Sequence, residues 1–144
     1  MKKRMLCVLG ILMALPAFAA PGGQERQQAF KKILQQFEPM GIVVRGRDPY
    51  DKSGFIQRAD ALKLVAAQPF PLFTPNSIDA GSRAKPEIWS QPQKFATARD
   101  AFLKSVNELD AAAHSGDLNA IKRSYDIVAQ SCKTCHDSFR GPKI

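Results

Sequence analysis

Cysteine and histidine are scarce in this sequence of 144 residues, which contains three cysteines and two histidines. Cys7 lies in an N-terminal segment that we expect to be removed, so only Cys132 and Cys135 remain in the mature chain. Both belong to one short motif, which excludes a framework of structural disulfides. A zinc site is disfavoured too, because the motif would need two further ligands and the chain offers only His114 and Cys7.

The sequence also lacks an apolar run long enough to span a bilayer. The apolar stretch from Met5 to Leu15 follows three basic residues and precedes the sequence Ala17-Phe18-Ala19. A basic start, a short apolar segment and an Ala-x-Ala site are typical of a secretory signal peptide. We expect cleavage after Ala19, which makes residues 1–19 the signal and residues 20–144 one exported domain in the periplasm. A retained N-terminal anchor is the alternative.

Acidic residues are fewer than basic ones, with 13 Asp and Glu against 21 Lys and Arg. A basic balance can indicate nucleic-acid binding, but export argues against it and the charges are interspersed rather than grouped in a block. A solvated basic surface is the simplest interpretation, and an acidic electron-transfer partner is the functional alternative.

Strand patterns, internal repeats, Gly-rich phosphate loops and Ser/His/Asp constellations are absent as well. Near the C-terminus the chain instead contains Cys132-Lys133-Thr134-Cys135-His136. This C-x-x-C-H run is the attachment motif of c-type haem. On a helix the two cysteines are three residues apart and leave from one face, and His136 follows as a ligand for the iron. A thioredoxin-like redox pair and half of a zinc site remain the alternatives.

Four segments show the apolar spacing of amphipathic helices. The first begins at Gln24 and is expected to end at Pro39-Met40-Gly41. The second follows Asp51 or Ser53 and stops before Pro69, and the third runs from about Gln93 to Ala113. Asp117 caps the fourth, whose apolar residues step by three and four in a heptad pattern: Leu118, Ile121, Tyr125, Val128, Cys132, Cys135 and Phe139.

Two short links and one long one join these segments, which predicts an all-α four-helix bundle with haem near the C-terminal end of the fourth helix. The long link, residues 69–92, contains five prolines, which exclude a long helix there. Trp89 in this link is expected to pin the loop to the core, and contact with the haem edge is compatible with that role.

The sixth ligand of the iron is the next question. After removal of the signal, the chain offers Met40 and His114, and neither is well placed. His114 lies at the opposite end of the fourth helix from the motif, about 28 Å away along the helix. A lysine stays possible. We therefore expect a five-coordinate haem with an apolar distal face.

Three stretches resemble one known family, the cytochromes c′ or class II c-type cytochromes. Residues 131–140, SCKTCHDSFR, look like the family's C-terminal signature, and residues 85–90, KPEIWS, are similar to its loop motif before the third helix. Residues 26–30, RQQAF, resemble the Arg-Gln-x-x-hydrophobe pattern of its first helix. The resemblance covers nearly the whole mature chain, with the three motifs in the family's order.

The resemblance implies an antiparallel bundle, usually a homodimer packed through its first helices, with a high-spin five-coordinate haem that binds NO and CO and disfavours O₂. Phe30 falls at the family's distal position, where a bulky apolar residue blocks the sixth site. Arg26 and Gln27 fall where family members contact the haem propionates, and Arg140 lies beside the proximal face. Without the resemblance, Phe30 is plain core and the two arginines are solvated charges.

We expect the dimer contact on the first helix, where three apolar residues extend beyond the seam of one bundle: Ala29, Ile33 and Phe37. Two functions share these features, capture of NO by a haem protein and electron transfer by a plain cytochrome. A peroxidase lacks support because no distal His–Arg pair is visible, so we expect a non-catalytic protein.

Overall fold

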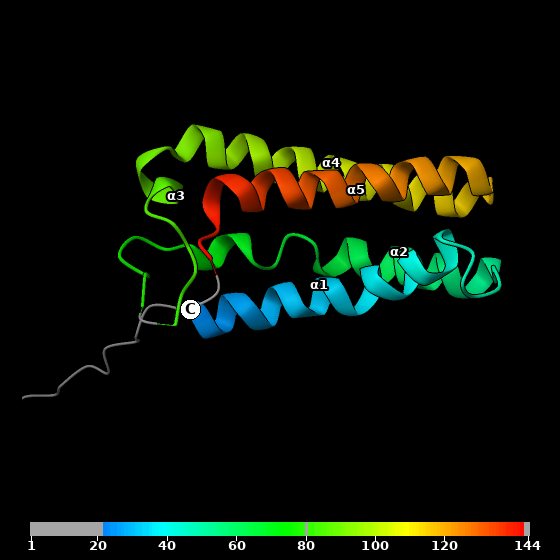
Figure 1. Cartoon of the computed structure of the whole chain (residues 1–144), viewed down its shortest axis with the longest axis horizontal. Coiled ribbons are helices and arrows are strands. Elements are labelled where there is room, and N and C mark those ends of the chain that lie inside the picture. The colour runs from blue at the N-terminus through cyan, green and yellow to red at the C-terminus, as the bar shows by residue number, and fades with distance from the viewer. Residues whose placement is uncertain (1–21, 80, 143–144) are drawn as a thin grey trace, which may run out of the picture.

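The computed structural model describes residues 22–79 and 81–142 of the chain, so the expected signal peptide lies outside the described residues. Four long helices form a bundle, with α1 and α2 in one layer and α4 and α5 in the other (Figure 1). Successive long helices run in opposite directions, which confirms the all-α antiparallel bundle. The elements are α1 (Gly23–Val44), α2 (Lys52–Val65), the short 3₁₀ helix η1 (Phe70–Leu72), α3 (Glu87–Ser90), α4 (Pro92–Ser115) and α5 (Leu118–Phe139).

Helix α1 continues past the point where the sequence predicted its end. Pro39 lies inside the helix, which runs on to Val44, so the predicted stop at Pro39-Met40-Gly41 is wrong. An internal proline costs about 3 kcal/mol, but Phe37 and Met40 on either side are buried in the core. Burial of one such side chain stabilises by about 1.5–3 kcal/mol, so the two together match or exceed the cost of the proline.

The other helix boundaries follow from local chemistry. The Asp51 carboxylate accepts hydrogen bonds from the Ser53 and Gly54 amides and caps α2. Asp117 does the same for α5 through the Asn119 and Ala120 amides. Gly116 ends α4 with a φ of 76°, in the left-handed region that favours glycine. The two-residue link between α4 and α5 therefore makes an antiparallel pair.

The core fills the bundle away from the haem motif. Its fully buried side chains come from all four long helices, among them Met40, Leu62, Leu109 and Ile121. The heptad seam of α5 faces this core as predicted, except that Leu118, the first residue of the helix, is 43% exposed at the end of the bundle. Ala29, Ile33 and Phe37 are all buried within the single chain, so the expectation that they extend beyond its seam is wrong.

The long link is fixed by hydrogen bonds rather than by regular structure. Trp89, on α3, donates its indole N–H to the carbonyl oxygen of Thr74 at 2.9 Å and so joins two parts of the link, but it is only partly buried and is not a residue of the core as predicted. A bridge pairs Ala84 with Arg140, and the Lys85 amide donates to the Phe139 carbonyl at 3.0 Å. The link is therefore held against the C-terminal end of α5. Among the described residues, none of the helices is both long and apolar enough to cross a membrane.

Candidate haem site

A cavity of about 380 Å³ opens at the end of the bundle that holds the N-terminus of α1 and the C-terminus of α5. Among the neighbouring pairs of long helices, α1 and α5 make the least extensive contact, and the cavity lies between them. Its volume is in the range of cofactor pockets, about 300–1,000 Å³. Its lining is mainly apolar. In addition to Phe30, it includes five phenylalanines from the link and from helices α4 and α5: Phe70, Phe73, Phe95, Phe102 and Phe139.

The last two turns of α5 bring the three motif residues to this cavity. Cys132, Cys135 and His136 all line it, and each is partly buried. Both cysteines are free thiols. Burial raises the pKa of Cys132 to about 11 and also raises that of Cys135, so the isolated polypeptide keeps them protonated. Two free thiols on one face of a helix, beside a cavity, fit the two thioether bonds of haem c.

His136 is held as a neutral imidazole. Burial lowers its pKa to about 4, and the nearby cations of Arg140 and Arg83 act in the same direction. A neutral imidazole is the form that ligates a metal. The residues present thus fit haem c: an apolar cavity of sufficient size, two thiols and an unprotonated histidine.

Phe30 lies on α1 opposite His136. The centroids of the two rings are 6.3 Å apart, with an angle of 71° between the ring planes. Phe30 also makes edge contacts with Phe70 at 6.2 Å and with Phe73 at 6.4 Å. Phe30 is therefore the aromatic side chain that faces the predicted iron ligand, within a cluster that fixes its position.

Arg26, one turn before Phe30, is almost completely buried at 3% exposure. Its guanidinium donates to the Ser77 hydroxyl and carbonyl at 2.9 and 2.8 Å, and to the Ser82 hydroxyl at 2.9 Å. It also lies 5.1 Å from the centre of the Phe73 ring. Arg26 therefore lines the cavity and, at the same time, holds the link in place over it.

Gln27 and Arg140 occupy the more open parts of the lining. Gln27 donates from its side-chain amide to the Gly81 carbonyl at 3.0 Å. Arg140 follows His136 by one turn, and its backbone amide donates to the His136 carbonyl at 2.9 Å. Both line the cavity, and their contacts with haem stay predictions.

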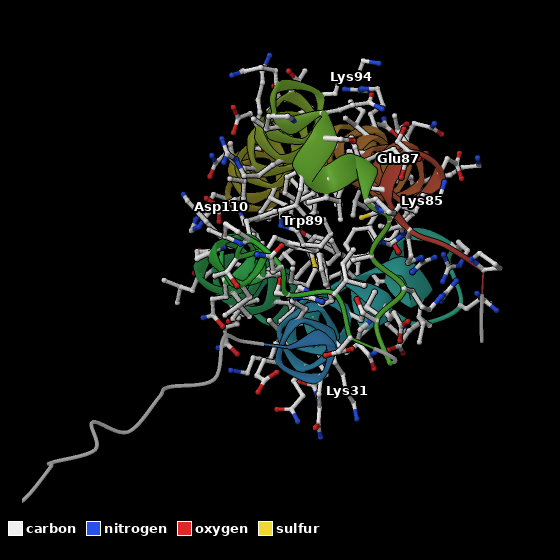
Figure 2. The ribbon with its side chains drawn as sticks, turned by 90° about the vertical axis from the view of Figure 1, so that its left-hand side faces the viewer. Lys31, Lys85, Glu87, Trp89, Lys94 and Asp110 are labelled. Atoms are coloured by element: carbon white, nitrogen blue, oxygen red, sulfur yellow. The ribbon has the colours of Figure 1, made fainter. Side chains whose placement is uncertain are left out.

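Trp89 is the predicted site residue that the cavity lining does not include. Its ring lies 6.4 Å from that of Phe73, and Figure 2 shows it among the side chains at this end of the bundle. It therefore supports the aromatic wall from behind, through Phe73 and Thr74, and its direct contact with haem stays a prediction.

Three further residues line the cavity that were not predicted as site residues: Phe70, Phe73 and Arg83. Phe70 and Phe73 lie in the proline-rich segment 69–75, where repeated aromatics between prolines were the available signal. Arg83 donates to the Gly141 carbonyl at 2.6 Å and so fixes the chain just beyond α5. Nothing in its local sequence marks this contact, because its partner lies 58 residues away.

The two candidate sixth ligands are remote from the cavity. Met40 is fully buried in the core at 0% exposure, and the cavity lining does not include it. His114 is exposed at the end of α4 and bonds to Asp60 at 2.9 Å. Lys31 is the described lysine that lines the cavity, and its side chain is exposed. The apolar face opposite His136 agrees with the expectation of a five-coordinate iron.

Comparison with known proteins gives one consistent result. A family model described as Cytochrome C' matches residues 23–140. Cytochrome c' of Alcaligenes xylosoxydans xylosoxydans is 36% identical over 118 residues, which cover 82% of this chain and 91% of that protein. The structure of a nitric oxide complex of a cytochrome c prime mutant from Alcaligenes xylosoxidans superposes with a TM-score of 0.82 at 36% identity, over 88% of this chain and 100% of that one.

A second solved structure is a carbon monoxide-bound variant of cytochrome c prime from the same organism. It superposes with a TM-score of 0.78 at 35% identity, and covers 83% of this chain and 93% of that one. The similarity therefore extends over the whole bundle, including both walls of the cavity.

Proposed function

Because this chain belongs to the cytochrome c′ family, we propose that it is a periplasmic haem protein that binds nitric oxide and carbon monoxide. The family consists of non-catalytic proteins with one covalent haem c. When bound, the haem supplies an iron that exchanges one electron and takes up a diatomic ligand. The relatives in complexes with nitric oxide and carbon monoxide support gas binding by this chain.

The observation that carries the proposal is the arrangement of His136 and Phe30 on opposite walls of one cavity. Cys132 and Cys135 would hold the haem by two thioether bonds, and His136 would ligate its iron. Phe30 would then occupy the side on which a sixth ligand enters. Of the described residues that line the cavity from α1, none has a sulfur or imidazole group to compete with an incoming gas.

Phe30 would select among ligands in two ways. An entering ligand must displace its ring from the contacts with Phe70 and Phe73, and each aromatic contact is worth about 0.5–1.5 kcal/mol. The ring also has no N–H or O–H group that could donate a hydrogen bond to a polarised ligand such as oxygen. Both effects lower affinity, and the second favours nitric oxide and carbon monoxide over oxygen.

The polar residues of the lining would bind the charged edge of the haem. Arg26 and Gln27, on α1, are proposed to contact the propionates, and Arg140 is proposed to lie beside the His136 side. The Arg26 guanidinium already donates to the link, so a propionate would join an existing network rather than create one. This would couple the position of the link to the presence of the haem.

Covalent attachment is tested by acid–acetone extraction of the purified protein. We expect the haem to stay with the polypeptide, and to be extracted when Cys132→Ala and Cys135→Ala are combined, because no thioether can then form. Haem that stays attached in the double variant would contradict the assignment of these two cysteines.

Gas binding is tested by absorption spectra of the ferric and ferrous protein, recorded with and without carbon monoxide and nitric oxide. We expect a five-coordinate high-spin ferrous spectrum that changes on addition of either gas. A six-coordinate low-spin spectrum that carbon monoxide leaves unchanged would contradict the proposal.

Electron transfer is the second candidate, and the charge around the cavity favours it. Lys31, Arg83 and Arg140 line the cavity, and Figure 2 shows Lys31, Lys85 and Lys94 on this end of the molecule. A positive rim around a redox group suits an acidic partner protein. The low-spin outcome of the spectral experiment would support this function instead.

We also propose that the protein is a homodimer packed through α1. The support is the family resemblance and the partial exposure of two apolar α1 residues, Leu34 at 45% and Ile42 at 42%. Light scattering at micromolar concentration should give twice the mass of the mature chain, and a monomer mass at this and higher concentrations would contradict the dimer.

A further inference from the structure

Two carboxylates and an imidazole converge on the flank of the bundle where α2 and α4 pack together. Asp60 comes from α2, while Asp110 and His114 lie one turn apart on α4. One ligand atom from each of the three residues lies within 4.8 Å of the others. Phe95, which lines the cavity, lies about 22 Å before Asp110 along the axis of α4, so this cluster is separate from the haem site.

The geometry of the cluster is set by rigid elements. Residues four apart on a helix share a face, which directs Asp110 and His114 to the same side of α4. The Asp60 carboxylate lies 2.9 Å from His114 Nε2, and Asp110 Oδ1 lies 3.8 Å from the same nitrogen. Ligand atoms around a zinc ion, at about 2.0–2.2 Å from the metal, are about 3.4 Å apart in a tetrahedral site. The observed separations bracket this value.

Asp110 supplies an independent indication that a cation belongs here. The residue is only 7% exposed, although it carries a carboxylate, and Figure 2 shows it on the flank of α4 that faces α2. Its Oδ2 atom pairs with Lys63 Nζ at 2.7 Å. Its Oδ1 atom is buried and has no hydrogen-bond partner among the described residues. A buried acceptor without a partner destabilises the fold, and does so more strongly when it is charged.

We propose that Asp60, Asp110 and His114 form a second metal site, for a divalent transition-metal ion of the zinc class, that clamps α2 to α4. One imidazole nitrogen and two carboxylate oxygens suit zinc, copper or nickel, whereas calcium and magnesium take oxygen ligands alone. Water would complete the coordination. The ion would satisfy Asp110 Oδ1, and it would replace the hydrogen bond between His114 and Asp60 that holds the cluster without metal.

The two ligands on the flanks of the cluster can be reached from solution. Asp60 and His114 are both about half exposed, at 51% and 53% of their side chains, which leaves an open path for the ion. Lys63 is the described cation that would compete, and it engages only the other oxygen of Asp110.

The test uses the untagged holoprotein, freed of metal with EDTA and then titrated with zinc chloride against a chromophoric chelator. We expect one zinc ion per chain, a higher Tm with zinc, and no change in the haem spectrum. His114→Ala and Asp60→Asn alter exposed side chains and should fold. Each should weaken zinc binding by about a hundredfold or more and abolish the rise in Tm, because loss of a second-shell partner alone costs 10–100-fold.

Glu108→Gln is the matched control, since Glu108 is an exposed acidic residue of the same helix outside the cluster. It should bind zinc as tightly as the unchanged protein. Absence of stoichiometric binding in the unchanged protein would overturn the proposal. Equal binding by His114→Ala and the unchanged protein would also overturn it, because the zinc would then be held elsewhere.

Discussion

Helices α1 and α5 face each other at two places along the bundle. The helices are closely packed at one place and separated by a cavity at the other. In the core, Phe37 and Tyr125 stack with ring centres 4.2 Å apart and planes 6° from parallel. One heptad earlier on α1, Phe30 faces His136 edge-on at 6.3 Å, beside a cavity of about 380 Å³. The same two helices thus seal the core with one aromatic pair and leave a cofactor-sized space beside the other.

A glycine explains much of the difference. A Cβ atom at Gly41 would overlap the Tyr125 hydroxyl oxygen, so the close approach of α1 to α5 in the core requires this residue. Among the described α1 residues that line the cavity, Gly23 is the glycine, and a Cβ atom there would meet Asp79 and Ser82 of the link. Arg26 and the link that it binds occupy the space beside this part of α1. The two helices are therefore in close contact in the core and are held apart beside the cavity.

The largest expected effect comes from removing the core ring. Phe37→Ala should lower the free energy of unfolding by about 3–5 kcal/mol, because it empties a buried site and breaks the stack on Tyr125. Chemical denaturation of the holoprotein measures this change. Carbon monoxide affinity should stay unchanged, and a shift in affinity as large as the one produced by Phe30→Ala would show that the two ends are not separate.

The second effect concerns the residue that holds the link. Arg26→Gln removes hydrogen bonds made by a buried charged group, and one such bond is worth about 1.5–3 kcal/mol. The free energy of unfolding should fall by about the value of one bond. Hydrogen exchange should become faster at the Ser77 and Ser82 amides. Arg58→Gln, on the exposed surface of α2, is the matched control and should change neither. Equal protection of the link in the Arg26 variant would contradict its role there.

The third effect tests the close approach at Gly41. Gly41→Val should lower the free energy of unfolding by about 1–3 kcal/mol, since the added atoms overlap Tyr125 and α1 must move away. Thermal unfolding of the holoprotein measures this change. A Cβ atom at Gly81 would meet only an ordinary contact at 3.7 Å, so Gly81→Ala should leave the Tm nearly unchanged. Equal Tm values for the two variants would contradict the claim that the close approach of α1 and α5 requires Gly41.

The helices and the haem motif could be predicted from the sequence because their signals are local. The heptad that contains Cys132 and Cys135 predicted the face that points into the bundle, and Asp117 predicted the start of α5. Pro39 misled the prediction, since the burial of Phe37 and Met40 that offsets its cost depends on helices far away in the sequence. Burial itself is a tertiary outcome, and local propensity describes it poorly.

The side of the cavity that the link forms could not be predicted either, because it depends on contacts between residues far apart in the sequence. Arg26 reaches Ser77 across 51 residues, and Trp89 fixes Thr74 in a segment without helical periodicity. Phe73 contacts both of these residues, since its ring centre lies 5.1 Å from the Arg26 guanidinium and 6.4 Å from the Trp89 ring. The resemblance to a family supplied Arg26, Gln27 and Phe30 as site residues, whereas spacing alone favoured a core role for Phe30.

The smallest of these changes tests the central claim, that Phe30 caps the side of the haem opposite His136. In Phe30→Ala the ring no longer has to be displaced, so carbon monoxide affinity of the ferrous protein should rise by about tenfold or more, equal to about 1.4 kcal/mol. Spectrophotometric titration of the unchanged protein and the variant, with Phe37→Ala as the control, measures it. A rise confined to Phe30→Ala is the predicted result, and identical affinities in all three proteins would contradict the cap.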